Sequence, residues 1–212
     1  MIRMKINTNS IIGFYAMQNY GKTYGIKQLI AKIAPHSKVL IYDTDFEGNS
    51  YIRGLPPEAA KNVFYVRAKN KSDQTDGEWV SRMLIDIRAQ YSNCFIIFED
   101  IDKLTDAHHS KALKEIYQLA SDSRHQRIGV IYATKEPVNI PVKLRSCTNL
   151  FFIGQFLEPA HLKTLAGFVD KDEIKKLKPP QFIRIDRLQH TSDVVQFTDG
   201  GQITTLKTLK VD

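Results

Sequence analysis

The chain has 212 residues, which is enough for one substantial hydrophobic core but not for two full domains. Hydrophobic residues make up 42% of it and charged residues 25%, values that are typical of globular proteins and exclude a largely disordered chain. Because no apolar run approaches the roughly 20 residues of a spanning helix, and no signal peptide is evident, we expect a soluble intracellular protein without an integral membrane segment. The net charge of +7 favours a polyanionic partner and high solubility equally.

The most informative stretch lies near the N-terminus, where an apolar run leads into a tight turn. Residues 16–23 match the phosphate-binding pattern G-x-x-x-x-G-K-[S/T], with Ala16 in place of the first glycine. Gly21 lets the backbone approach a polyphosphate, Lys22 meets its β and γ oxygens, and the Thr23 hydroxyl is offered to Mg²⁺. We therefore predict an ATP site formed by Ala16, Met17, Gln18, Asn19, Tyr20, Gly21, Lys22, Thr23 and Tyr24.

The segments on either side of the loop favour this interpretation over a Gly-Lys-Thr that merely opens a helix. Ile11 to Tyr15 is a short apolar run that suits a buried parallel strand. Apolar residues then recur at 26, 29, 30 and 33, which is the spacing of one helical stripe. Strand, loop and helix therefore come in the required order.

A second predicted strand, Val39 to Tyr42, ends in acidic residues at 43 and 45. Open α/β sheets bind ligands beyond the carboxyl ends of their strands, so these carboxylates are candidates for a ligand site. Capping of the next element is an equally good interpretation.

The strand predicted at Cys94 to Phe98 is apolar throughout and is followed directly by Glu99 and Asp100. Hydrophobic residues followed by two acids form a Walker B element, in which one carboxylate holds Mg²⁺ and the other polarises the attacking water. The commoner order is Asp then Glu, so the inverted pair leaves the two roles open. We assign Glu99 to Mg²⁺, together with Thr23, and Asp100 to the water.

Strands and helices alternate along the rest of the chain, which predicts a P-loop NTPase fold with a mainly parallel sheet sandwiched by helices. Lys135 follows the strand predicted at 128–133, where a polar side chain can reach the γ-phosphate. Past residue 178 the pattern changes to three short antiparallel strands. We therefore divide the chain into a P-loop ATPase core, 1–178, and a β-rich C-terminal extension of the same domain, 179–212. The other predicted strands are 63–66 and 150–153, and the further helices are 80–87, 113–120, 158–168 and 172–177.

The order of these motifs resembles the FtsK/HerA superfamily, especially its compact viral DNA-packaging ATPases. Besides the phosphate loop and the acid pair, the shared features are an Arg-His pair at 124–125, a Thr-Lys-Glu-Pro element at 134–137 and an Ile-Pro-Val-Lys-Leu-Arg segment at 140–145. The resemblance covers residues 11–156. The chain departs from the family at Ala16, in the inverted acid pair, and at Lys135, where the family usually has a glutamine that can accept a hydrogen bond from water.

The resemblance implies a homo-oligomeric ring, usually a hexamer, with ATP at the subunit interfaces and double-stranded DNA in the central channel. The expected function is therefore an ATP-driven DNA translocase that packages a viral genome into a preformed capsid. Capsid or vertex proteins would be its partners, in the host cytoplasm or in association with the virion. The resemblance also implies that Arg124 reaches the ATP of the neighbouring subunit, with Arg145 as a rival and a simple surface arginine as the alternative.

Two other functions stay open. A small-molecule P-loop kinase would also place an acid after its second strand, but its lid is usually rich in arginine, whereas residues 175–180 contain lysines and no arginine. A phage assembly ATPase that acts on protein has a related fold, but it generally carries a transmembrane segment. Assays of ATP hydrolysis with duplex DNA and with nucleoside acceptors distinguish these functions.

Overall fold

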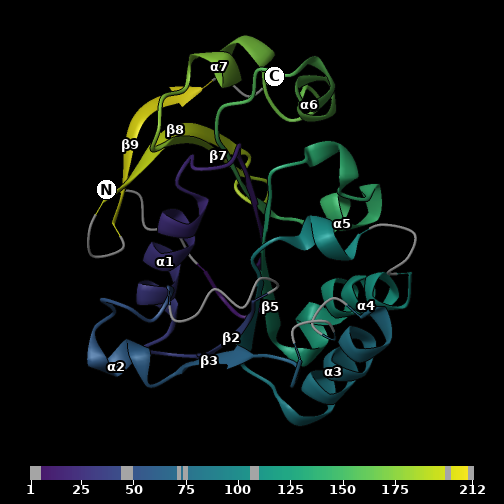
Figure 1. The fold of residues 1–212 in the computed structure, drawn as a ribbon. Coiled ribbons are helices and arrows are strands. Elements are labelled where there is room, and N and C mark those ends of the chain that lie inside the picture. The colour runs from purple at the N-terminus through teal and green to yellow at the C-terminus, as the bar shows by residue number, and fades with distance from the viewer. Residues whose placement is uncertain are drawn as a thin grey trace.

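The structure of the protein is a computed structural model that describes residues 6–43, 50–70, 73, 76–105, 110–198 and 202–209, without the side chain of Arg124. In this part of the chain the strands form one nine-stranded sheet in the order β3-β2-β4-β5-β1-β6-β7-β8-β9, with helices on both faces (Figure 1). The predicted α/β fold class is therefore confirmed. Asp45 lies outside the described residues.

The strands from β3 to β6 in this order run parallel. Every residue of β1, β4, β5 and β6 is buried, which is typical of parallel strands covered by helices on both faces. These strands are the continuous apolar runs of the sequence, so the predicted positions are confirmed to within a residue. The parallel strands are β1 (Ile11–Tyr15), β2 (Lys38–Tyr42), β3 (Val63–Val66), β4 (Cys94–Phe98), β5 (Ile128–Thr134) and β6 (Leu150–Ile153).

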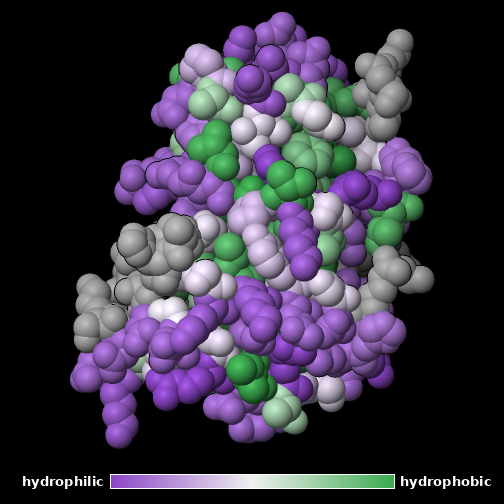
Figure 2. Space-filling view, turned by 90° about the vertical axis from the view of Figure 1, so that its right-hand side faces the viewer, coloured by the Kyte–Doolittle hydropathy of each residue, from purple (hydrophilic) through white to green (hydrophobic). Residues whose placement is uncertain are grey.

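Helix α1 (Lys22–Ile33) covers one face of the sheet, and α3 (Gly77–Gln90), α4 (Ser110–Gln126) and α5 (Val142–Cys147) lie over the other (Figure 1). The predicted apolar stripe of α1 is its buried face. Figure 2 shows that the outer face over the second set of helices is largely hydrophilic. No helix in the described ranges combines the length and apolar character needed to cross a bilayer. The remaining helices are α2 (Pro57–Ala60), η2 (Ile101–Leu104), η4 (Pro137–Asn139), α6 (Pro159–Leu165) and α7 (Lys171–Lys176).

Three antiparallel strands, β7 (Gln181–Asp186), β8 (Thr191–Thr198) and β9 (Gln202–Leu209), continue the sheet from β6. Inside this hairpin region, Arg184 and Asp193 form a fully buried ion pair, and the Thr208 hydroxyl donates to the same aspartate at 2.9 Å. Phe182 and Phe197 pack against Phe14 of β1, with ring centroids 6.0 Å apart in both pairs. The C-terminal strands are therefore held against the strand that leads into the phosphate loop.

Candidate active site

The phosphate-binding loop joins β1 to α1 and has the backbone geometry that anion binding needs. Asn19 and Gly21 adopt left-handed conformations, with φ of 59° and 103°. Gly21 is the N-cap of α1, no side chain caps this end of the helix, and the first turn contains no acidic residue. The first amide groups of α1, at the positive end of the helix dipole, are therefore available for a phosphate.

Ala16, the departure from the glycine pattern, is fully buried and does not have a left-handed backbone. Its amide donates to the carbonyl of Thr134 at 3.2 Å, which continues the pairing of β1 with β5. Gly154, the residue after β6, faces the Ala16 side chain and leaves room for its methyl group. An alanine at this position is thus compatible with the loop.

Lys22 reaches back over the loop that precedes it. Its ammonium group donates to the carbonyl oxygens of Ala16 at 2.7 Å and Met17 at 2.9 Å. Burial lowers the pKa of Lys22, while the nearby carboxylates of Asp100 and Asp102 act in the opposite direction. The charge is therefore held at the mouth of the loop, as the predicted contact with β and γ oxygens requires.

A cleft of about 260 Å³ opens beside the loop and brings the predicted residues together. The physical reason is the strand order, because β4, β5 and β1 are neighbours whose carboxyl ends meet at one edge of the sheet. Met17, Tyr20 and Tyr24 do not line it, and Tyr20 instead packs edge-on against Phe182. The lining residues are Gln18, Asn19, Lys22, Thr23, Tyr51, Glu99, Asp100, Lys103, Ala133 and Lys135.

The two acids of the Walker B element have different partners. Glu99 accepts a hydrogen bond from the Tyr51 hydroxyl at 2.9 Å. Asp100 forms an ion pair with the ammonium group of Lys103, at 3.7 Å. Both acids line the cleft, so the structure is compatible with either division of their roles.

Asp102, two residues further on, ties the end of β4 to the end of β5. Its carboxylate accepts hydrogen bonds from the Thr134 hydroxyl at 2.5 Å and from the backbone N–H of Lys135 at 3.1 Å. Burial raises the pKa of Asp102, and these two hydrogen bonds act in the opposite direction. Asp102 thus fixes the backbone from which the Lys135 side chain reaches the cleft.

Sequence reasoning missed Tyr51, Lys103 and Asp102. Asp102 and Lys103 lie just beyond the predicted acid pair, so the run of charges after β4 was the available signal. Tyr51 carries no such signal, because only the tertiary fold brings it to Glu99, 48 residues away.

Asp43, at the end of β2, neither lines the cleft nor caps a described helix. It is 1% exposed and forms an ion pair with Arg67 at 2.8 Å. The guanidinium group of Arg67 stacks on the ring of Tyr65, 4.6 Å from its centroid. The acid is therefore part of a buried support between the ends of β2 and β3.

Of the two candidate arginines, Arg145 has a described side chain, and it does not line the cleft. The backbone of Arg124 lies in the last turn of α4, and its side chain is outside what the structure describes. Arg145 is partly buried in α5, where its carbonyl accepts a hydrogen bond from Arg187 at 3.4 Å.

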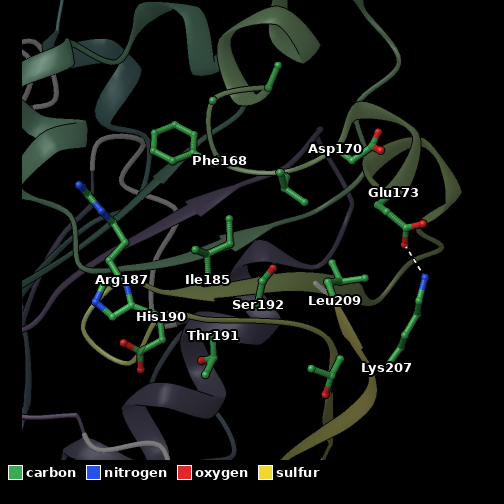
Figure 3. Close-up of a pocket in the computed structure, with 15 residues that line it drawn as sticks. Phe168, Asp170, Glu173, Ile185, Arg187, His190, Thr191, Ser192, Lys207 and Leu209 are labelled. Carbon is green, nitrogen blue, oxygen red and sulfur yellow. Dashed lines mark hydrogen bonds and ion pairs between the residues drawn. The ribbon is translucent and has the colours of Figure 1, made fainter. Parts of the chain in front are cut away.

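A larger hollow of about 830 Å³ lies between α7 and the C-terminal strands. Figure 3 shows Glu173 and Lys207 joined across it by an ion pair of 2.9 Å. None of the described side chains that line this hollow belongs to a residue predicted to carry chemistry. The smaller cleft at the phosphate loop is therefore the candidate active site.

No protein-family model matches the chain, and no curated protein matches it. Solved structures do match. The DNA-packaging ATPase B204 from Sulfolobus turreted icosahedral virus is 18% identical, with 89% of this chain and 98% of that chain covered and a TM-score of 0.67. The genome packaging NTPase B204 from Sulfolobus turreted icosahedral virus 2, in complex with AMPPCP, is 14% identical, with 89% and 97% covered and a TM-score of 0.68.

A bacterial secretion protein has a similar fold. The cytoplasmic domain of the type VII secretion ATPase EccC from Thermomonospora curvata is 11% identical, with 99% of this chain and 25% of that chain covered and a TM-score of 0.63. At these identities the likeness concerns the fold alone. The chain therefore has the P-loop ATPase fold of these proteins, as the alternation of its strands and helices predicts.

Proposed function

We propose that the protein hydrolyses ATP and uses the energy to move double-stranded DNA into a viral capsid. The observation that carries this proposal is the cleft in which Lys22, Thr23 and the acid pair meet at the ends of adjacent strands. The packaging role is supported by the fold shared with B204, of which this chain covers 98%.

The residues of the cleft suit a magnesium-bound nucleotide. The hydroxyl of Thr23 and the carboxylate of Glu99 are oxygen donors of the kind that Mg²⁺ prefers. When bound, the ion neutralises charge between the β and γ phosphates. Lys22 binds the β and γ oxygens, and the amide groups at the start of α1 bind the remaining phosphate oxygens.

Asp100 is the residue that we assign to the attacking water. A carboxylate accepts the hydrogen bond of a water and orients its lone pair towards phosphorus. Lys135 lacks an acceptor and cannot take this role, so we assign it to the charge of the γ-phosphate. Its backbone, held by Asp102, gives it a fixed starting point at the end of β5.

The proposed partner is the backbone of double-stranded DNA. A net charge of +7 suits binding to phosphates without reading bases. We further propose a homo-oligomeric ring, with a hexamer as the expected form, in which Arg124 or its rival Arg145 completes the site of the next subunit. Its proposed protein partners are viral capsid or vertex proteins, in the host cytoplasm or in association with the virion.

The test is release of phosphate from ATP with Mg²⁺, measured alone, with duplex DNA and with nucleoside acceptors. We expect hydrolysis that duplex DNA stimulates and that Lys22→Ala removes. Transfer of phosphate to an acceptor would support the kinase instead. Hydrolysis that responds to a protein substrate but not to DNA would support an assembly or secretion role.

A further inference from the structure

Tyr51 joins two segments of the cleft that are far apart in the sequence. The side chain is 0% exposed, although it contributes to the lining of the cleft. Its hydroxyl donates to Oε1 of Glu99 at 2.9 Å, and Thr23 lines the same cleft beside it. The two residues that it contacts are the two predicted ligands of Mg²⁺.

The direction of the hydrogen bonds that Tyr51 can form follows from the chemistry of a hydroxyl group. A phenol has one proton to donate, and Tyr51 donates it to Glu99, so the phenol oxygen can only accept a hydrogen bond from the Thr23 hydroxyl. Burial and the carboxylate of Glu99 raise the pKa of Tyr51, which keeps this proton on the phenol. A hydrogen bond donated by Thr23 would therefore complete a chain of protons from Thr23 through Tyr51 to Glu99.

This chain has a consequence for a cation in the cleft. A threonine hydroxyl binds a metal through an oxygen lone pair, and the cation repels its proton. With that proton directed at Tyr51, the lone pairs of Thr23 are directed elsewhere. The hydrogen bond from Tyr51 restricts the rotation of the Glu99 carboxylate. Both groups would therefore be ordered before a metal binds.

The backbone of Tyr51 is held by a separate hydrogen bond. Its N–H donates to the hydroxyl of Tyr65 at 3.1 Å. The ring of Tyr65 lies under Arg67, which pairs with the buried Asp43. The support at the ends of β2 and β3 thus fixes the position of Tyr51.

We propose that Tyr51 is a positioning residue that orders Thr23 and Glu99 for Mg²⁺ through its hydroxyl. The inference rests on the proposed function, since it concerns the same site. The competing explanation is that Tyr51 is only a core aromatic residue, in which case the ring matters and the hydroxyl does not.

The test compares Tyr51→Phe with the wild-type protein in the binding of a fluorescent ATP analogue, in EDTA and across a Mg²⁺ titration. We expect equal affinity in EDTA. The Mg²⁺ concentration for half-maximal binding should rise about tenfold or more, the factor expected for loss of a hydrogen bond to a charged group. Saturating Mg²⁺ should restore much of the hydrolysis rate.

Tyr132→Phe is the matched control. Tyr132 is also 0% exposed, and its hydroxyl also has two side-chain partners, Tyr15 at 2.6 Å and Thr148 at 2.7 Å, but it does not line the cleft. This variant should keep the wild-type Mg²⁺ dependence. In a Glu99→Gln background, Tyr51→Phe should have a smaller effect than in the wild type, because the proposal routes part of its effect through Glu99.

The outcomes separate the inference from the proposed function. A wild-type protein that fails to bind the ATP analogue, or binds it without any effect of Mg²⁺, contradicts the proposed function itself. If the wild type responds to Mg²⁺ and Tyr51→Phe responds equally, only the inference fails. If Tyr51→Phe melts well below the Tyr132→Phe control, the Tyr51 hydroxyl mainly stabilises the fold, and this outcome also overturns the inference.

Discussion

Gly154 lies directly against Ala16, so that a Cβ atom on Gly154 would be 2.7 Å from the Ala16 methyl carbon and 2.6 Å from the ring of Tyr20. Real Cβ atoms do not approach other atoms so closely, and the Ala16 neighbour is attached to the backbone of the phosphate loop. The loop and the end of β6 are therefore fitted to each other.

Gly154→Ala should destabilise the protein by about 1–3 kcal/mol, the usual cost of forcing an extra carbon into a packed site. The measurement is urea unfolding. Gly167→Ala is the control, because a Cβ atom at Gly167 would meet nothing within 4 Å. Adding Ala16→Gly to Gly154→Ala should recover part of the loss. Equal stability of the two single variants would contradict the proposed fit.

Lys22→Ala should lower the rate of ATP hydrolysis by about 10²-fold or more while leaving the fold intact, since it removes the cation at the mouth of the loop. Phosphate release and thermal unfolding are the two measurements. Lys32→Ala, which removes an exposed lysine from the last turn of the same helix, is the control and should hydrolyse ATP normally. Turnover retained in Lys22→Ala would exclude this cleft as the site.

Glu99→Gln and Asp100→Asn should both hydrolyse ATP slowly, but for different reasons. If Glu99 binds Mg²⁺, its variant loses the gain in nucleotide affinity that Mg²⁺ gives. If Asp100 orients the water, its variant keeps that gain and loses only turnover, by about 10²- to 10⁴-fold. Nucleotide affinity with and without Mg²⁺, measured beside the rate, separates the roles. Near-normal rates in both variants would show that neither acid takes part.

Most of the fold could be predicted because its central strands are continuous apolar runs. β4 and β6, for example, are buried at every position and stand out in the sequence. Helix α5 was missed for the opposite reason. It has six residues and buries only Leu144, so the sequence shows no periodic apolar stripe that would predict a helix.

The residues of the candidate site also fall into those that a local pattern predicts and those that it does not. Lys22, Thr23 and Glu99 were predicted because each follows a strand or loop with a recognisable local pattern, and parallel strands bring their carboxyl ends together. Tyr51 could not be predicted, because its role depends on the distance between its hydroxyl and Glu99 in the folded chain. Local patterns name the residues that meet the phosphates, whereas the residues that support them depend on tertiary packing.

Affinity for duplex DNA should fall steeply as salt rises, with the logarithm of the binding constant linear in the logarithm of salt concentration. The physical reason is the release of counterions as Lys and Arg side chains neutralise phosphates. Duplexes of different sequence should bind almost equally, because backbone contacts carry no sequence information. Fluorescence anisotropy at several salt concentrations provides the measurement. A flat response would indicate another partner.

Arg124→Ala should slow hydrolysis by about 10³- to 10⁵-fold if its guanidinium group stabilises charge on the phosphoryl group of a neighbouring subunit's ATP. In the proposed ring the arginine belongs to one subunit and the phosphate loop to the next, so mixing two inactive variants tests the arrangement. Inactive Arg124→Ala and inactive Lys22→Ala proteins, assembled together, should regain part of the activity, because some interfaces then pair an intact loop with an intact arginine.

The same mixture with Arg145→Ala in place of Arg124→Ala tests the rival arginine, and Arg82→Ala, an exposed arginine on α3, is the control. Only the variant that lacks the arginine acting on the neighbouring subunit's ATP should be inactive alone and active in the mixture. If the arginine acted within its own subunit, its alanine variant would also be inactive alone. Mixing it with Lys22→Ala would then give no more activity than the two separate proteins. Normal hydrolysis by Arg124→Ala with DNA present would leave it as a surface residue at the end of α4.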